Sequence, residues 1–255
     1  MAARDDASAA DDLRLLDIDI ATMFALTPSG RILRESPRDN SPGPRLFFAC
    51  CAGGDRMRLR FDVSDPVARA IQALAETEPP WRDPARPPAG LSALMDLLAQ
   101  DAPVQAAASS LIYRLPHGLA FETDAEMVCS DTSAGEDLLA GLAKTGMPPH
   151  LVEAGFVGLD DFWAPWCAAR IAGEIAAMVF AARLGPEGAE TGVYTFPAYR
   201  GRGLGAAVTA AWSRLPALAD RSLFYSTHLT NRSSQRVAER LGLRRFAHGI
   251  ALRDL

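Results

Sequence analysis

The chain has 255 residues, of which 49% are hydrophobic and 22% are charged. This composition is typical of a folded globular protein with one large core or two smaller ones, and it excludes a largely disordered chain. The net charge of −5 argues against nucleic acid as a main partner, because affinity for a phosphate backbone depends on clustered positive charge. Lys144 is the only lysine, and the excess of arginine and alanine suggests a GC-rich bacterial source.

The four cysteines, Cys50, Cys51, Cys129 and Cys167, show neither a C-x-x-C pair nor the histidine spacing of a zinc site. This pattern predicts buried, reduced thiols, with no bound metal and no disulfide scaffold. The first residues lead into the acidic pair Asp5 and Asp6 and not into an apolar segment, and no apolar run reaches the length of a membrane span. We therefore expect a cytoplasmic protein without a membrane partner.

Residues 1–104 are predicted to form an N-terminal α+β region. Two short strands are expected within residues 23–35, around a glycine-containing turn. Residues 46–51 and 57–61 are expected to form a hairpin around a second glycine-containing turn. Asp65 is predicted to cap a helix that has Pro66 at its first position, and residues 91–98 to form a second helix. The proline-rich segment 78–90 is interpreted as a linker or surface loop. The region shows no catalytic constellation, and it is either one wall of an acceptor pocket or a stabilising or dimerising subdomain.

The middle of the chain contains further strand and helix signals. Residues 111–115 and 126–130 have strand character, Ser133 begins a capping box ahead of a helix, and residues 167–183 are expected to form a hairpin. Asp161 and Trp163 are candidates for binding a cationic amine acceptor, because aromatic faces and carboxylates both attract cations. Packing in the core or at a hinge is the alternative for Trp163.

The stretch from Glu190 to Ala206 predicts a strand, a bend, a glycine-rich turn and the start of a helix. Such a turn directs backbone N–H groups and a helix N-terminus toward one point, which favours a phosphate. A Walker A loop is excluded because no lysine follows the glycines. Gly201, Gly203 and Ala206 formally match a dinucleotide fingerprint, but the chain that remains is too short for the series of βαβ units this fold needs.

Two motifs fit another family better. Pro197, Arg200, Gly203 and Gly205 match a pyrophosphate loop of the form V-x-P-x-x-R-G-x-G-x-G/A. The segment from Asn231 to Leu243 matches a second signature, N-x-x-[SA]-x-x-[apolar]-x-x-x-[LM]-G-[FL]. With these residues, the chain resembles the GNAT superfamily of acyl-CoA-dependent N-acyltransferases over residues 105–255.

The resemblance implies an α+β fold in which a central mixed, mostly antiparallel sheet is flanked by helices. It implies acetyl-CoA as the cosubstrate, bound between two splayed strands at residues 193–195 and 223–227. The residues implied in binding it are Tyr194, Thr195, Phe196, Arg200, Gly201, Arg202, Gly203, Leu204, Gly205, Ala206, Asn231 and Ser234. For Asn231, capping of a helix is a second role that is compatible with the first.

The resemblance also implies candidates for catalysis. Glu190 lies where several family members keep a carboxylate that deprotonates the amine, although an exposed glutamate at a strand end is the alternative. Ala238 occupies the position at which many members carry the tyrosine that protonates the leaving thiol. Tyr225, Ser226, Ser233 or solvent would have to replace that tyrosine, and Tyr225 is our candidate. His248, in a strand with alternating apolar residues, is interpreted as a packed side chain.

Two functions remain open on the sequence alone. The first is an N-acetyltransferase acting on a small-molecule amine by direct attack in a ternary complex, and the second is an acyl-CoA-binding module without catalysis. The family's last hairpin also lacks a strand, since one strand follows Leu243. A strand from the N-terminal half, or from the second copy in a homodimer, would complete that edge.

Overall fold

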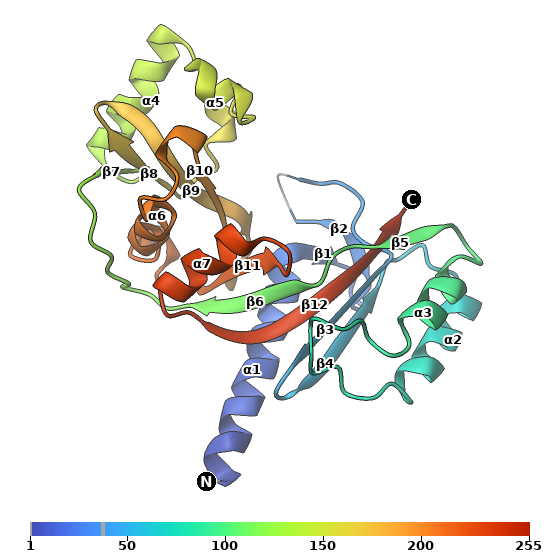
Figure 1. Cartoon of the computed structure of the whole chain (residues 1–255). Helices are drawn as coiled ribbons and strands as arrows, with labels where there is room; N and C mark the ends of the chain where they lie inside the picture. The colour runs from blue at the N-terminus through green and yellow to red at the C-terminus, as the bar shows by residue number, and fades with distance from the viewer. Residues whose placement is uncertain (1, 37–38) are drawn as a thin grey trace.

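The computed structural model describes residues 2–36 and 39–255, which adopt a mixed α+β fold with one large, mostly antiparallel sheet flanked by helices, as predicted (Figure 1). The α-helices are α1 (Ala2–Met23), α2 (Asp65–Ala75), α3 (Leu91–Leu98), α4 (Ser133–Thr145), α5 (Pro149–Glu153), α6 (Leu204–Trp212) and α7 (Arg232–Arg240). The strands are β1 (Phe24–Leu26), β2 (Ile32–Glu35), β3 (Leu46–Cys51), β4 (Gly54–Leu59), β5 (Val104–Ala106), β6 (Ser110–Leu115), β7 (Glu126–Cys129), β8 (Trp166–Ile171), β9 (Glu174–Leu184), β10 (Gly188–Thr195), β11 (Ser222–His228) and β12 (Arg244–Asp254).

The large sheet has the order β4-β3-β12-β6-β11-β10-β9-β8-β7, with β5 added beside β12. Within the described residues, β10 and β11 form its parallel pair, and the other neighbours are antiparallel. The last strand, β12, lies between β6 and β3, which both precede it in the chain. Strands from the first half of the molecule therefore fill the edge that the sequence left open.

Both faces of the sheet are covered. Helix α6 packs on one face around Val208 and Trp212, in a core that includes β8, β9 and Leu223 of β11. Helix α1 packs on the opposite face, where Leu15 and Leu16 contact a core that includes Phe224. Successive residues of a strand point to opposite faces, so neighbours along β11 belong to different cores. Helices α2 and α3 cover β3 and the end of β12 (Figure 1).

Two predicted helix starts are displaced by one residue. The N-cap of α2 is Ser64, not Asp65, and its side chain makes no capping hydrogen bond. The N-cap of α4 is Thr132, not Ser133, and its hydroxyl accepts a hydrogen bond from the backbone N–H of Gly135. Ser and Thr are both favoured N-cap residues, so a run of such residues leaves the exact boundary undetermined. The division between residues 104 and 105 stays a prediction, and the sheet is continuous across it.

The proline-rich segment 78–90 is an irregular loop that packs on the molecule. Trp81 is buried within it, where it stacks on Phe48 and meets the edge of His248 at 4.5 Å between ring centroids. His248 Nε2 also lies 3.1 Å from the carbonyl of Trp81, and burial lowers the pKa of this histidine. The interpretation of His248 as a packed side chain is therefore confirmed.

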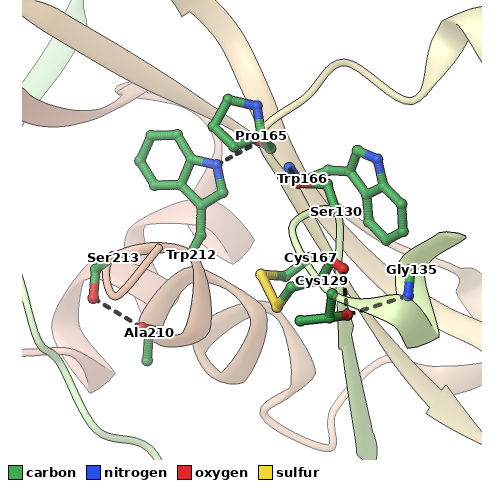
Figure 2. The surroundings of a disulfide bond; sticks show 10 residues. Cys129, Ser130, Gly135, Pro165, Trp166, Cys167, Ala210, Trp212 and Ser213 are labelled. Carbon is green, nitrogen blue, oxygen red and sulfur yellow. Dashed lines mark hydrogen bonds between the residues drawn. A yellow bond between two sulfur atoms is a disulfide. The ribbon is translucent and has the colours of Figure 1, made fainter. Parts of the chain in front are cut away.

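The prediction that all cysteines are reduced is wrong for one pair. Cys129 at the end of β7 and Cys167 in β8 form a disulfide, and their Cα atoms are 4.1 Å apart in directly paired positions of the antiparallel ladder (Figure 2). The pairing could not be read from a separation of 38 residues, because register within the sheet brings the two side chains together. Cys50 and Cys51 are free, and burial raises the pKa of the Cys50 thiol to about 12.

Candidate functional site

The strands β10 and β11 separate at the centre of the sheet. Their parallel ladder joins Gly188 to Ser222 and ends where Glu190 pairs with Phe224. A β-bulge between β9 and β10 occurs at the same level, directly after Glu190. Bulges bend a strand and end pairing locally, so the second half of β10 turns away from β11. From Thr191 on, β10 pairs with β9 alone, and a gap opens between the two strands.

A cleft with a volume of about 490 Å³ extends from this gap toward the N-terminus of α6 and the exposed face of α7. Gly201 and Gly203 have φ values of +83° and +80°, in the left-handed region that favours glycine. A Cβ on Gly203 would lie 3.3 Å from the guanidinium of Arg240. Among the described residues, the cleft is lined by Arg200, Arg236 and Arg240 and by no acidic side chain. A helix N-terminus surrounded by arginines is suited to an anion such as a pyrophosphate.

Most residues implied in coenzyme binding meet in this cleft. They are Tyr194, Thr195, Arg200, Gly201, Gly203, Leu204, Gly205, Ala206, Asn231 and Ser234. Two others lie outside its lining. Phe196 is buried in an aromatic cluster with Tyr194, and Arg202 lies over the ring of Tyr199 at 5.7 Å from its centroid.

Asn231 begins α7 as its N-cap. Its side-chain oxygen accepts a hydrogen bond of 3.1 Å from the backbone N–H of Ser234, so the capping role is confirmed. The residue also lines the cleft. At the other end of the helix, Gly242 has a φ of +61° and follows the C-cap residue Leu241.

A second cavity, also of about 490 Å³, adjoins the first on the α1 side of the sheet. Four residues of the gap line both cavities: Val193, Tyr225, Asn231 and Ser234. Met23, Phe24 and Phe47 of the N-terminal half line its apolar part. The N-terminal half therefore forms a wall of the second cavity, one of the two roles that the sequence allowed.

Glu190 lines the second cavity and is 8% exposed, so it is not an exposed strand-end residue. Its carboxylate accepts a hydrogen bond from the hydroxyl of Ser226 on β11. Burial raises the pKa of Glu190, an effect that the Ser226 hydrogen bond and the charge of Arg183 partly offset. A buried carboxylate with a raised pKa that faces a cavity is a candidate general base.

Asp19 of α1 is fully buried, and neither of its carboxylate oxygens has a hydrogen-bond partner among the described residues. Burial raises the pKa of Asp19 well above its ordinary value, and the charge of Glu190 raises it further. An ionised carboxylate without partners would be very costly at this position, so the side chain is held as the neutral acid.

The second cavity also contains ion pairs around one buried carboxylate. Glu35 at the end of β2 is 2% exposed and is bound by two arginines. Nη2 of Arg183 lies 3.3 Å from one oxygen of Glu35, and Nη2 of Arg253 lies 2.8 Å from the other. Arg183 also pairs with Asp39 at 2.8 Å.

Tyr225 lies in the gap between the two cavities and is 2% exposed. Its hydroxyl is 2.6 Å from Oγ of Ser234 in the first turn of α7, and its ring meets Tyr113 edge to face. Burial raises the pKa of Tyr225 to about 12, so the phenol keeps its proton at neutral pH. Ala238, where many family members carry a tyrosine, is buried in α7.

The remaining predicted pair lies elsewhere. The carboxylate of Asp161 accepts hydrogen bonds from the backbone N–H groups of Val157 and Gly158, at 2.7 and 2.9 Å. Trp163 meets Phe180 edge to face. Neither Asp161 nor Trp163 lines the two cavities at the gap, so the structure does not bring them together with Glu190.

Several residues of the site were missed in the sequence. Asp19 had a detectable signal, since it shares one helical face with the apolar residues Leu15 and Leu16. Arg236 and Arg240 are spaced to lie on one face of the helix after Asn231. Glu35 and Arg253 had no such signal, because they are 218 positions apart and only the tertiary fold brings them together.

The part of the chain that the structure describes lacks a helix suited to crossing a membrane and a cluster of side chains suited to a metal ion. None of its helices combines the length and apolar character needed to cross a bilayer. Its His, Cys, Asp and Glu side chains also form no group of three or more that could hold a metal ion.

The chain matches known proteins over the region that forms this site. Residues 142–243 match the model of the acetyltransferase (GNAT) family. Among solved structures, a tandem GNAT protein from the clavulanic acid biosynthesis pathway is 14% identical, with 100% of this chain and 97% of that chain covered and a TM-score of 0.46. A GNAT-family acetyltransferase from Colwellia psychrerythraea is also 14% identical. The match covers 78% of this chain and 76% of that chain, with a TM-score of 0.41.

No curated protein matches the chain. The family match includes the glycine-rich loop, α6, β11 and α7, which are the elements that build the arginine-lined cleft. Residues 142–243 therefore match the acetyltransferase (GNAT) family in the part of the chain that builds this cleft.

Proposed function

We propose that this protein transfers an acetyl group from acetyl-CoA to the primary amine of a small molecule, by direct attack in a ternary complex. The observation that carries the proposal is the meeting of two cavities at the gap between β10 and β11. The arginine-lined cleft opens toward α6 and α7, and the cavity that contains Glu190 adjoins it from the α1 side. A donor and an acceptor bound in these cavities would meet at Val193 and Tyr225.

The residues of the cleft fit coenzyme A. Glycine at positions 201 and 203 lets the backbone approach a pyrophosphate, and the first turn of α6 presents N–H groups to it. The edge of β10 that faces the gap has no strand partner beyond Glu190, so its backbone groups are free to bind an extended amide chain. The hydroxyls of Thr191 and Thr227, which line the adjoining cavity, have no hydrogen-bond partner among the described residues. The free backbone groups of β10 suit the amides of a bound acyl-pantetheine.

The proposed transfer uses one residue for each of its two proton transfers. Acetyl-CoA supplies the activated acyl group when bound. Glu190 would accept the proton of the amine as the new C–N bond forms, and a raised pKa strengthens its carboxylate as a base. Tyr225 would donate its phenolic proton to the sulfur of the leaving thiol as the C–S bond breaks. Its hydrogen bond to Ser234 fixes the hydroxyl in the gap.

The alternative function is an acyl-CoA-binding module without catalysis, and Ala238 is the observation that favours it. A screen for thiol release from acetyl-CoA, across amino acids, polyamines, aminoglycosides and peptides, separates the two. An enzyme releases free thiol in proportion to an added amine, whereas a binding module binds acetyl-CoA and releases none. We propose the cytoplasm as the location of the reaction, in line with the expectation from the sequence.

Gly203→Glu is the matched control. A non-glycine residue is strained at a φ of +80°, and a carboxylate there would repel the pyrophosphate. The variant should lose acetyl-CoA binding in calorimetry while its circular dichroism spectrum stays that of the parent protein. Normal binding by this variant would show that the pyrophosphate is held elsewhere.

A further inference from the structure

We propose that the acceptor carries an anionic group, most simply a carboxylate, in addition to its amine, and that Arg253 binds this group in the cavity that contains Glu190. This inference rests on the proposed function, because it names the class of amine that the second cavity accepts. It follows from the ionisable groups that line this cavity and from the partners that each of them has.

The carboxylates of the cavity are already engaged. Its lining contains two of them, Glu35 and Glu190. Glu35 is buried between two arginines, and Glu190 is bound by Ser226. If Glu190 receives the reacting amine, no second free carboxylate in this lining is left for another ammonium group. A polyamine would then bring extra positive charge against the two arginines, which costs free energy in a partly desolvated cavity.

The two arginines of the cavity, Arg183 and Arg253, differ in the number of hydrogen-bond partners that they already have. Arg183 donates to Glu35, to Asp39 and to the carbonyl of Ala182. For Arg253, the described residues provide one partner, which is Glu35 at 2.8 Å from Nη2. A guanidinium has five N–H donors, and the side chain of Arg253 is 44% exposed. It therefore presents unused donors, held in place by the buried Glu35.

The position of Arg253 fits the same acceptor. The neighbouring Ala251 packs with the core on the α1 side, and Arg253 follows it two residues along β12, on the same face. Its ion-pair partner Glu35 also pairs with Arg183, and the charges of both Arg183 and Glu35 act on Glu190. The lining also contains apolar side chains, including Met23, Phe24 and Phe47. The cavity therefore suits a small molecule that carries an amine, a carboxylate and an apolar side group.

Matched acceptors test this inference directly. L-leucine, L-leucinamide, 3-methylbutylamine and spermidine would be compared in the thiol-release assay, with rates referred to the concentration of neutral amine. We expect kcat/KM for leucine to exceed that for the two leucine analogues by about tenfold or more, the usual value of a charge-assisted hydrogen bond. Equal values for leucine and its uncharged analogues, or a preference for spermidine, would overturn the proposal.

Variants of Arg253 assign the preference to this residue. Arg253→Gln should reduce the ratio of kcat/KM for leucine to kcat/KM for leucinamide to about one, and it should leave the KM for acetyl-CoA unchanged. Arg253→Lys should keep part of this ratio because it keeps the charge. Arg86→Gln is the matched control, because the side chain of Arg86 is 85% exposed on the proline-rich loop. If Arg253→Gln kept the full ratio, another group would bind the carboxylate.

A binding measurement separates this inference from the proposed function. Calorimetric titration of the CoA-loaded protein with N-acetyl-L-leucine and with N-acetyl-L-leucinamide needs no turnover. If no amine releases thiol, the proposed transfer fails. Tighter binding of the carboxylate probe, lost in Arg253→Gln, would then still support the anion site, and equal binding of both probes would refute it.

Discussion

Glu190 and Phe224 form the last pair of the parallel ladder between β10 and β11, and the two strands separate directly after it. The side chain of Glu190 is therefore held by the closed part of the sheet at the point where the gap begins. Ser226, two residues beyond Phe224 on the same face of β11, donates a hydrogen bond to its carboxylate. A base fixed on two strands at the opening can act on a group that enters the gap from the α1 side.

Glu190→Gln should lower kcat/KM for the acceptor by about 10²- to 10³-fold, because an amide cannot accept the proton of the amine. The Kd of acetyl-CoA should change little, since Glu190 is not among the residues that line the arginine-rich cleft. Steady-state kinetics and calorimetry measure the two quantities. A loss of acetyl-CoA binding of similar size would mean that Glu190 supports the coenzyme site instead.

The pH profile gives a second test of the same residue. Because the pKa of Glu190 is raised above 4.5, the parent enzyme should gain activity as pH rises through that raised value and the carboxylate forms. A separate rise at higher pH belongs to the acceptor, whose amine must lose its own proton. Glu190→Gln should remove the first rise of activity in the pH profile and keep the second. A profile that is the same in both proteins would exclude Glu190 as the base.

Asp19→Asn should make the stability of the protein less dependent on pH. The folded protein holds Asp19 as the neutral acid, whereas the unfolded chain loses this proton near pH 3.8. The stability that the raised pKa contributes is complete at a pH below the pKa of Asp19 in the unfolded chain. It is lost as the pH rises toward the pKa of Asp19 in the folded protein. Urea denaturation from pH 4 to 8 should show the unfolding free energy of the parent falling more steeply than that of the variant. Parallel curves would show that Asp19 ionises in the folded state as it does in the unfolded chain.

Arg236→Gln and Arg240→Gln should each weaken acetyl-CoA binding by about fivefold, and the double variant by more. Both side chains are exposed at the cleft, so solvent screening reduces each contribution to about 1 kcal/mol. The salt dependence of Kd should become shallower in the double variant, because fewer cations face the phosphates. Arg86→Gln serves again as the control, and an equal effect there would point to net charge alone.

The resemblance to a known family implied the splayed strands, whereas the glycine-rich turn and the helix after it were predicted from local features. Gly203 and Gly205 with Arg200 define the turn, and the buried stripe from Leu204 to Trp212 fixes the helix behind it. These features involve neighbours in the chain, so spacing alone reveals them.

The acceptor cavity could not be predicted in the same way. Glu35 comes from β2, Arg253 from the last strand and Phe24 from β1, and none of these belongs to a motif. Their proximity depends on the position of β12 between β6 and β3, which is a property of the whole sheet. The disulfide between Cys129 and Cys167 has the same origin, since it depends on the register of β7 against β8.

Tyr225→Phe should lower kcat by about ten- to a hundredfold, because phenylalanine keeps the ring but has no proton to give to the leaving thiol. The pKa of about 12 means that the parent enzyme should lose no activity through ionisation of this phenol below pH 9.

The hydroxyl also binds Ser234, so the variant could act by shifting the start of α7. Ser234→Ala is the control, since it removes the hydrogen bond to Oγ of Ser234 but leaves the phenol, which also donates to the backbone carbonyl of Ser234 at 3.1 Å. Tyr225→Phe should reduce kcat much more than Ser234→Ala, with acetyl-CoA affinity similar in both. Equal losses of kcat would show that the contact with α7 matters and that solvent protonates the thiol. A Tyr225→Phe enzyme with full activity would show that the thiolate leaves unprotonated, which is compatible with Ala238 in α7.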